Sequence, residues 1–106
     1  MFKPDDVNNI RRRVCSELGN YIEVEFDEGL AYHGIFTVIW FRVDGQPLAV
    51  MNWSGENTIH EMVTYKVGRA GLSIRSQEDL DADEYFASLD RATDRVITIL
   101  KESTHP

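Results

Sequence analysis

Apolar residues recur at helical spacing near both ends of the chain and alternate with polar residues in between. The first stripe predicts a helix over about residues 5–18, opened by Pro4 and two aspartates and ended by Gly19-Asn20. The last stripe predicts a helix over about residues 81–101, behind the capping-box patterns Ser76-x-x-Asp79 and Asp81-x-x-Glu84. We expect both helices to bury their apolar stripes, which are Val7, Ile10, Val14, Leu18 and Phe86, Leu89, Val96, Leu100.

The middle of the chain has the pattern of successive strands. Residues 21–26 alternate in polarity, Asp27-Glu28-Gly29 predicts a short hairpin turn, and the longest strand follows over about residues 30–43. Asp44-Gly45 is the strongest hairpin signal, and residues 48–53 return antiparallel to the long strand.

The pattern is weaker from residue 54 onward. Residues 54–57 break the alternation, residues 58–63 fit either a strand or one helical turn, and residues 64–67 suit a strand. A turn over residues 68–71 and a short strand over residues 72–75 follow. The sequence therefore predicts a single α+β domain over residues 1–106, with an antiparallel sheet of four to five strands flanked by an N-terminal helix and a long C-terminal amphipathic helix.

The long strand over residues 30–43 is apolar on both of its faces. Because an antiparallel sheet normally shows one polar face to water, this strand should be covered on both sides. Either a bulge at Gly34 exchanges the faces midway, or both helices pack on one side and the other side meets a partner. Without the bulge, we expect a homodimer or a stable complex through that face.

Charge narrows the class of partner. The chain carries 11 Lys and Arg against 18 Asp and Glu, a net charge of −7, and residues 76–106 alone hold eight acidic and three basic groups. That balance disfavours nucleic acid and anionic membranes as direct partners and favours a basic protein. No segment has the length and apolar content of a membrane span, and the N-terminus lacks an apolar signal core, so a cytoplasmic protein is expected.

No catalytic or metal motif emerges. A single cysteine, Cys15, excludes an internal disulfide, and its place beside the first apolar stripe favours packing over pairing with His33 or His60 as a nucleophile. The zinc-protease pattern that begins at His60 lacks its second histidine, and the aspartates at 79, 81 and 83 lack the glycine that a calcium loop needs. We expect no catalytic residues, no metal and no cofactor.

The densest chemical feature is a run of carboxylates at the start of the predicted second helix. Capping needs only one or two of them, so the surplus predicts a docking surface for a basic partner. The residues of this predicted partner-binding surface are Glu78, Asp79, Asp81, Asp83, Glu84, Asp90 and Asp94.

In size, charge and element order the chain resembles the small acidic chaperones of bacterial secretion systems, and it is similar to small acidic proteins that inhibit toxins or phage-defence complexes. The leading hypothesis is a non-enzymatic inhibitor that docks an acidic surface on a basic, nucleic-acid-handling protein. One alternative is a dimeric chaperone or adaptor that binds through an apolar sheet face. A second alternative is a small-ligand protein or enzyme that uses the sheet aromatics Tyr32, Phe36, Trp40, Phe41 and Trp53.

Overall fold

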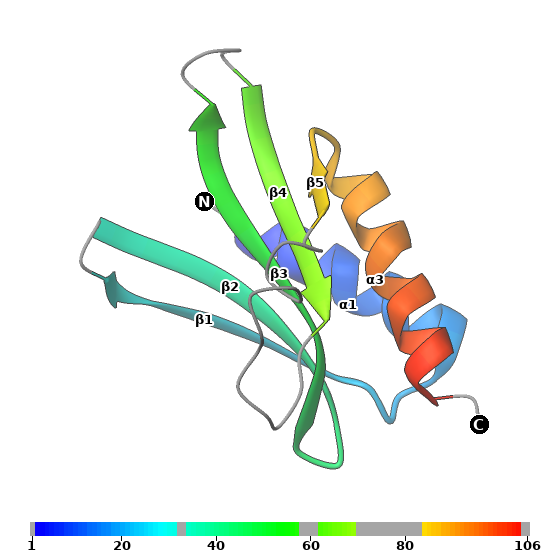
Figure 1. Cartoon of the computed structure of the whole chain (residues 1–106). Coiled ribbons are helices and arrows are strands. Elements are labelled where there is room, and N and C mark those ends of the chain that lie inside the picture. Colours follow the sequence, from blue (N-terminus) through cyan, green and yellow to red (C-terminus); the bar gives the residue numbers. More distant parts are fainter. Residues whose placement is uncertain (1, 32–33, 58–61, 70–83, 105–106) are drawn as a thin grey trace.

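The computed structural model describes residues 2–31, 34–57, 62–69 and 84–104 (Figure 1). The elements within these residues are, in order, α1 (Pro4–Leu18), β1 (Glu23–Ala31), β2 (Gly34–Val43), β3 (Gln46–Asn57), β4 (Met62–Arg69), β5 (Glu84–Phe86) and α3 (Leu89–Thr104). The strands form one antiparallel sheet in the order β1-β2-β3-β4-β5. The predicted α+β class is confirmed.

The first helix follows its sequence signals. Pro4 occupies the first turn, where its missing N–H costs nothing, and the Asp6 carboxylate accepts a hydrogen bond from the Lys3 backbone N–H at 3.0 Å. The helix ends where Gly19 takes a φ of 119° and donates its N–H to the Cys15 carbonyl. Val7, Ile10 and Val14 are buried as the stripe predicts.

The predicted turn at residues 27–29 is wrong. Asp27, Glu28 and Gly29 lie inside β1 and pair with Val38, Thr37 and Phe36 of β2 in unbroken register. The connection falls instead at residues 32–33, outside the described part of the chain. Continued pairing satisfies the backbone groups of several more residues, which outweighs the turn preference of Asp-Glu-Gly.

The predicted long strand over residues 30–43 is therefore divided. Its first residues, Leu30 and Ala31, close β1, and β2 begins at Gly34. Gly34 pairs regularly with Ala31, so the first of the two alternatives for this strand, a bulge at Gly34, is wrong. The irregularity in β2 lies between Phe41 and Arg42, where the register with β3 shifts just before the turn.

The second hairpin is confirmed. Asp44 and Gly45 both have positive φ, 52° and 79°, as the tight turn between β2 and β3 requires. The expected break at residues 54–57 is wrong, because β3 continues to Asn57. The strand accommodates Gly55 by a shift in its register with β4 between Trp53 and Gly55.

The structure describes only part of the segment from residue 58 to residue 75. The strand interpretation holds from Met62, and β4 extends through the expected turn residue Gly68 to Arg69. Residues 58–61, the expected turn residues 70–71 and the strand expected over residues 72–75 lie outside the described residues.

The last helix begins later than predicted. Glu84, Tyr85 and Phe86 form β5 on the edge of β4 rather than the first turn of a helix. α3 starts at Leu89, where the Ser88 hydroxyl accepts the Arg91 N–H at 3.4 Å. An open sheet edge next to two aromatic residues that favour strands overrides the helical spacing of this segment.

Both helices pack against one face of the sheet. The core unites the stripe of α1 with one face of β2, β3 and β4 and with α3, which crosses β3, β4 and β5 (Figure 1). From the sheet it takes Ile39, Phe41, Ala49, Met51 and Val67, and from α3 it takes Ala92, Val96, Ile97, Ile99 and Leu100. The two predicted apolar stripes are thus confirmed except at Phe86, which packs against the core from β5, and Leu18 and Leu89 are partly buried.

Candidate protein-binding edge

The described members of the predicted acidic surface are largely engaged within the molecule. The Glu84 carboxylate lies 2.8 Å from the Arg95 guanidinium, and Asp94 forms an ion pair with Arg13 of α1. Asp90 is exposed, and its backbone carbonyl accepts a hydrogen bond from Arg13. The other four residues, Glu78, Asp79, Asp81 and Asp83, lie outside the described residues.

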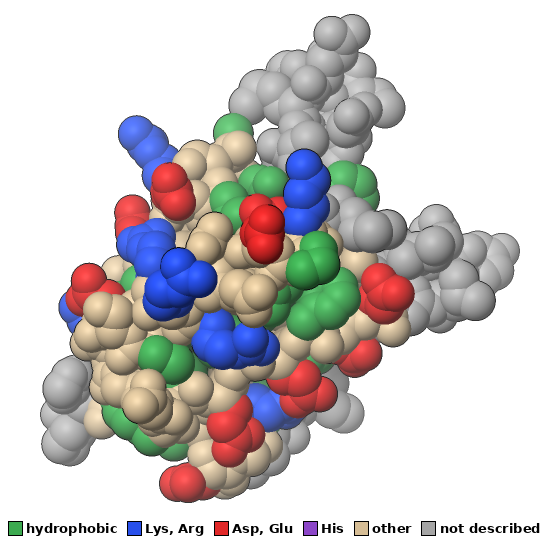
Figure 2. Space-filling model, turned by 180° about the vertical axis from the view of Figure 1, so that it is seen from behind, with side chains coloured by type: hydrophobic (Ala, Val, Ile, Leu, Met, Phe, Trp, Pro, Cys, Tyr) green, Lys and Arg blue, Asp and Glu red, His purple; other side chains and the backbone are tan. Residues whose placement is uncertain are grey.

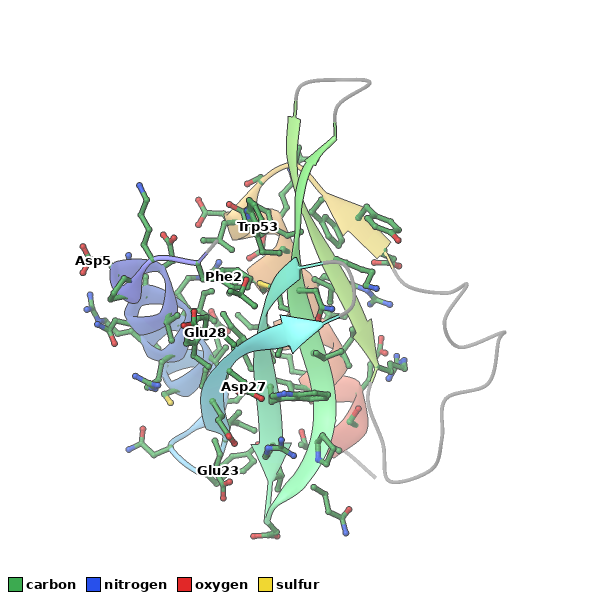
Figure 3. The ribbon with its side chains drawn as sticks, turned by 90° about the vertical axis from the view of Figure 1, so that its left-hand side faces the viewer. Phe2, Asp5, Glu23, Asp27, Glu28 and Trp53 are labelled. Carbon is green, nitrogen blue, oxygen red and sulfur yellow. The ribbon has the colours of Figure 1, made fainter. Side chains whose placement is uncertain are left out.

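A different row of carboxylates lies on the edge strand β1. Glu23, Glu25 and Asp27 lie on one face of this strand, Glu28 lies on the other, and all four are exposed (Figure 3). We call these four residues the acidic edge. β1 is the terminal strand of the sheet, so its second side has no neighbouring strand among the described residues.

Only one member of the acidic edge has a basic partner. The Arg42 guanidinium lies 3.2 Å from a Glu25 oxygen and 5.2 Å from the centre of the Trp40 ring. Glu23, Asp27 and Glu28 form no ion pair with any described residue. By contrast, on the side of the molecule that carries α1, Lys and Arg side chains lie among Asp and Glu side chains (Figure 2).

Among the described residues, one hydrogen bond reaches the outer side of the β1 backbone. There, the Arg11 guanidinium of α1 donates a hydrogen bond to the Val24 carbonyl at 3.1 Å. In an antiparallel pair, alternate residues direct both backbone groups toward the neighbouring strand or away from it. Because the Val24 carbonyl faces away from β2, the backbone groups of Phe26 and Glu28 face the same open side.

A groove runs between this edge and the start of α1. It has a volume of about 420 Å³ and is lined by Phe2, Pro4, Val7, Asn8, Arg11, Phe26 and Glu28. Phe26 remains 36% exposed, although its ring meets Phe2 edge-on at 6.4 Å. The groove therefore presents an apolar floor beside the unpaired carboxylate of Glu28.

The floor of the groove is fixed from below. Phe2 is buried and stacks on Tyr65 of β4 with ring centres 5.9 Å apart. Burial, together with the nearby negative charge of Asp6, raises the pKa of Tyr65 above its ordinary value. Phe2 is thus packed between two aromatic neighbours, Phe26 and Tyr65.

The sequence contained a signal for this edge. Residues 14–41 include Glu17 and the four acidic-edge residues but no lysine or arginine. The alternation of residues 21–26 does predict that Glu23 and Glu25 are exposed on a strand. What it does not predict is that this strand ends the sheet, because strand order depends on pairings far apart in the sequence.

The described residues contain no second cluster of candidate catalytic or metal-binding side chains. Cys15 is half-buried on α1, and His33 and His60 lie outside the described ranges. No group of three or more His, Cys, Asp or Glu side chains that could hold a metal occurs among the described residues.

A ligand site built from the sheet aromatics was the second alternative, but the aromatic side chains that the structure describes do not line one common pocket. Phe41 is fully buried in the core and Trp53 packs against it from the same face, whereas Trp40 lies on the opposite face under Arg42. The structure does not describe the side chains of Tyr32 and Phe36. Of the helices that the structure describes, none has the length and apolar character needed to cross a membrane.

Comparison with known proteins adds no relative: the chain matches no family model, no curated protein and no solved structure. The acidic edge and its groove are therefore the features of the described residues that bear on function.

Proposed function

We propose that this protein is a small non-enzymatic, cytoplasmic binding module that docks an acidic surface on a basic partner protein. The observation that carries the proposal is the set of three unpaired carboxylates, Glu23, Asp27 and Glu28, beside an open strand edge and an apolar groove. Carboxylates without intramolecular partners keep their full attraction for a cation, and they speed the association of oppositely charged proteins.

The class of partner follows from the spacing of these charges. Glu23, Glu25 and Asp27 share one face of β1, and residues two apart on a strand are about 6.8 Å apart. Carboxylates at this spacing are comparable to the phosphates of a nucleic-acid strand, with the middle one, Glu25, paired to Arg42. A protein that binds nucleic acid through a basic surface is the partner that such a row would block, which makes an inhibitor the proposed role.

A charge-matched pair of variants tests the proposal. The edge variant carries Glu23→Gln, Asp27→Asn and Glu28→Gln, and the control carries Glu17→Gln, Asp44→Asn and Glu102→Gln on other elements. Both lose three charges, so any difference between them is local. From lysate of the native cell, the wild type and the control should capture the same basic protein, and the edge variant should lose it.

The purified partner then allows a kinetic measurement. We expect the edge variant to associate roughly tenfold more slowly than the control at low salt, with a flatter dependence on salt. Equal association rates for the two variants would contradict the proposal. The cluster predicted from sequence stays a prediction, and a third variant, with Asp79, Asp81 and Asp83 changed to Asn and Glu84 to Gln, tests it in the same assay.

The arrangement of the helices favours a second candidate, the dimer through the outer sheet face. The described helices α1 and α3 cover one face, and the opposite face carries the half-buried residues Trp40 and Val50. Sedimentation at micromolar concentration distinguishes the two: a dimer that Val50→Lys dissociates supports this candidate, and a monomer contradicts it.

A further inference from the structure

We infer that the acidic edge takes an extended basic segment of its partner, which adds to the sheet as a strand beside β1 and places an apolar side chain in the groove between β1 and α1. The inference rests on the proposed function and adds the mode of binding. Its basis is the open backbone of β1, the groove and the charge on both, rather than the carboxylates alone.

The open backbone sets where the strand would lie. The backbone groups of Phe26 and Glu28 face away from β2, and an extended segment there completes their hydrogen bonds as a neighbouring strand does. Arg11 occupies the Val24 carbonyl and so marks one end of the available edge. The stretch from Phe26 to the end of β1 at Ala31 remains for a partner.

The two faces of β1 set which side chains the segment needs. Within the stretch left for a partner, a side chain opposite Asp27 shares a face with a carboxylate, so lysine or arginine is favoured there. Side chains on the other face lie next to Phe26 and the apolar groove, where a β-branched or aromatic residue fits. The recognised pattern is therefore an alternation of basic and apolar residues.

Charge excludes a second copy of this chain as the occupant. Two β1 strands paired edge to edge would bring two rows of carboxylates together, and like charges facing each other across strands are destabilising. A basic strand removes that repulsion, which is the complementarity that selects the partner.

A buried hydroxyl, that of Thr37, lies one strand in from the acidic edge. Thr37 lies directly across from Glu28 in the β1–β2 register, is 3% exposed, and its hydroxyl has no hydrogen-bond partner. Buried polar groups are rarely left unpaired, and exceptions gather where something else completes them. Thr37 lies on β2 and is not among the residues that line the groove.

Backbone-methylated peptides test strand addition separately from charge attraction. The probe is acetyl-Lys-Val-Lys-Val-Lys-Val-Lys-amide, with the matching Glu-Val peptide as the charge control. One derivative is N-methylated at the valines and a second at the lysines, which leaves charge unchanged. In an antiparallel addition only the valine N–H groups face β1; in a parallel addition only the lysine N–H groups do.

We expect the Lys-Val peptide to bind the protein and the Glu-Val peptide not to bind, as measured by calorimetry at low salt. One methylated derivative should bind at least roughly tenfold more weakly than the other. Equal binding of both derivatives overturns strand addition and leaves charge-driven docking intact. If the Lys-Val and Glu-Val peptides bind equally, the proposed function falls as well.

The groove is tested with a matched pair of aromatic substitutions. Phe26→Ala should weaken binding of the Lys-Val peptide by roughly tenfold, because it removes the exposed floor of the groove. Tyr85→Ala, which removes an exposed aromatic ring from the opposite edge strand, should leave binding unchanged. Equal effects of the two substitutions overturn the assignment of the groove, and circular dichroism of both variants checks that the fold is retained.

Discussion

The acidic edge and the surface of α3 are both rich in carboxylates, yet they use them differently. Around α3, Asp94 pairs with Arg13, Glu102 with Arg69, and Lys101 lies 3.5 Å from Glu17. Along β1, Glu25 is the one carboxylate with a basic partner among the described residues. The number of acidic residues in a segment is therefore a poor guide to its availability; what decides it is whether the fold brings a cation to each one.

The difference has a geometric cause. α3 lies between α1 and the strands β3, β4 and β5, so basic residues from several elements reach its charges. β1 has a neighbouring strand on one side only, and α1 sends just Arg11 to its open side, where the guanidinium bonds to a carbonyl rather than a carboxylate. An edge strand keeps its charges because few elements surround it.

The largest expected effect is the difference in lost stability between a substitution in the core at α3 and one in the groove. Leu100 is fully buried, so Leu100→Ala should lower the free energy of unfolding by about 2–5 kcal/mol. Phe26→Ala removes a larger but 36% exposed side chain and should lower it by only about 1–2 kcal/mol. Urea unfolding of both variants measures this. A larger loss for Phe26→Ala would show that the groove is part of the core and that its aromatic floor serves stability.

A smaller effect, of opposite sign in the two regions, comes from two buried threonines. The Thr37 hydroxyl has no partner, whereas the Thr93 hydroxyl of α3 donates to the Leu89 carbonyl at 2.8 Å. Thr37→Val should therefore raise the free energy of unfolding by about 1 kcal/mol, and Thr93→Val should lower it by about 0.5–1.5 kcal/mol. If Thr37→Val destabilises the free protein, its hydroxyl is already satisfied and says nothing about a partner.

The fold was predictable where signals are local and periodic. The apolar stripe of α1 and the turn residues Asp44 and Gly45 each depend on a few neighbouring residues, and each prediction was confirmed. The errors fall where distant pairing overrides local preference. Asp27 to Gly29 pair with β2 instead of turning, and Glu84 to Phe86 pair with β4 instead of starting a helix.

The site was harder to predict than the fold for the same reason. The close succession of acidic residues favoured residues 78–94 as the binding surface. In the structure, however, Glu84 and Asp94 pair with arginines that lie 11 and 81 residues away along the chain. The acidic edge became visible only once β1 was known to end the sheet. The groove beside it needs Phe2 and Phe26, which come together from two separate elements.

The smallest expected effect tests the comparison of charges itself. Asp94→Asn removes a carboxylate paired with Arg13 and should lower the free energy of unfolding by roughly 0–1 kcal/mol, as exposed ion pairs generally do. Asp27→Asn removes an unpaired carboxylate from a row of like charges and should leave stability unchanged or raise it by a few tenths of a kcal/mol. Both differences should shrink at high salt, because screening weakens paired attraction and unpaired repulsion alike. Urea unfolding at low and high salt supplies all four values. Loss of stability in Asp27→Asn equal to that in Asp94→Asn would mean that the acidic edge is held by a cation within the protein, and its charges would then not be free for a partner.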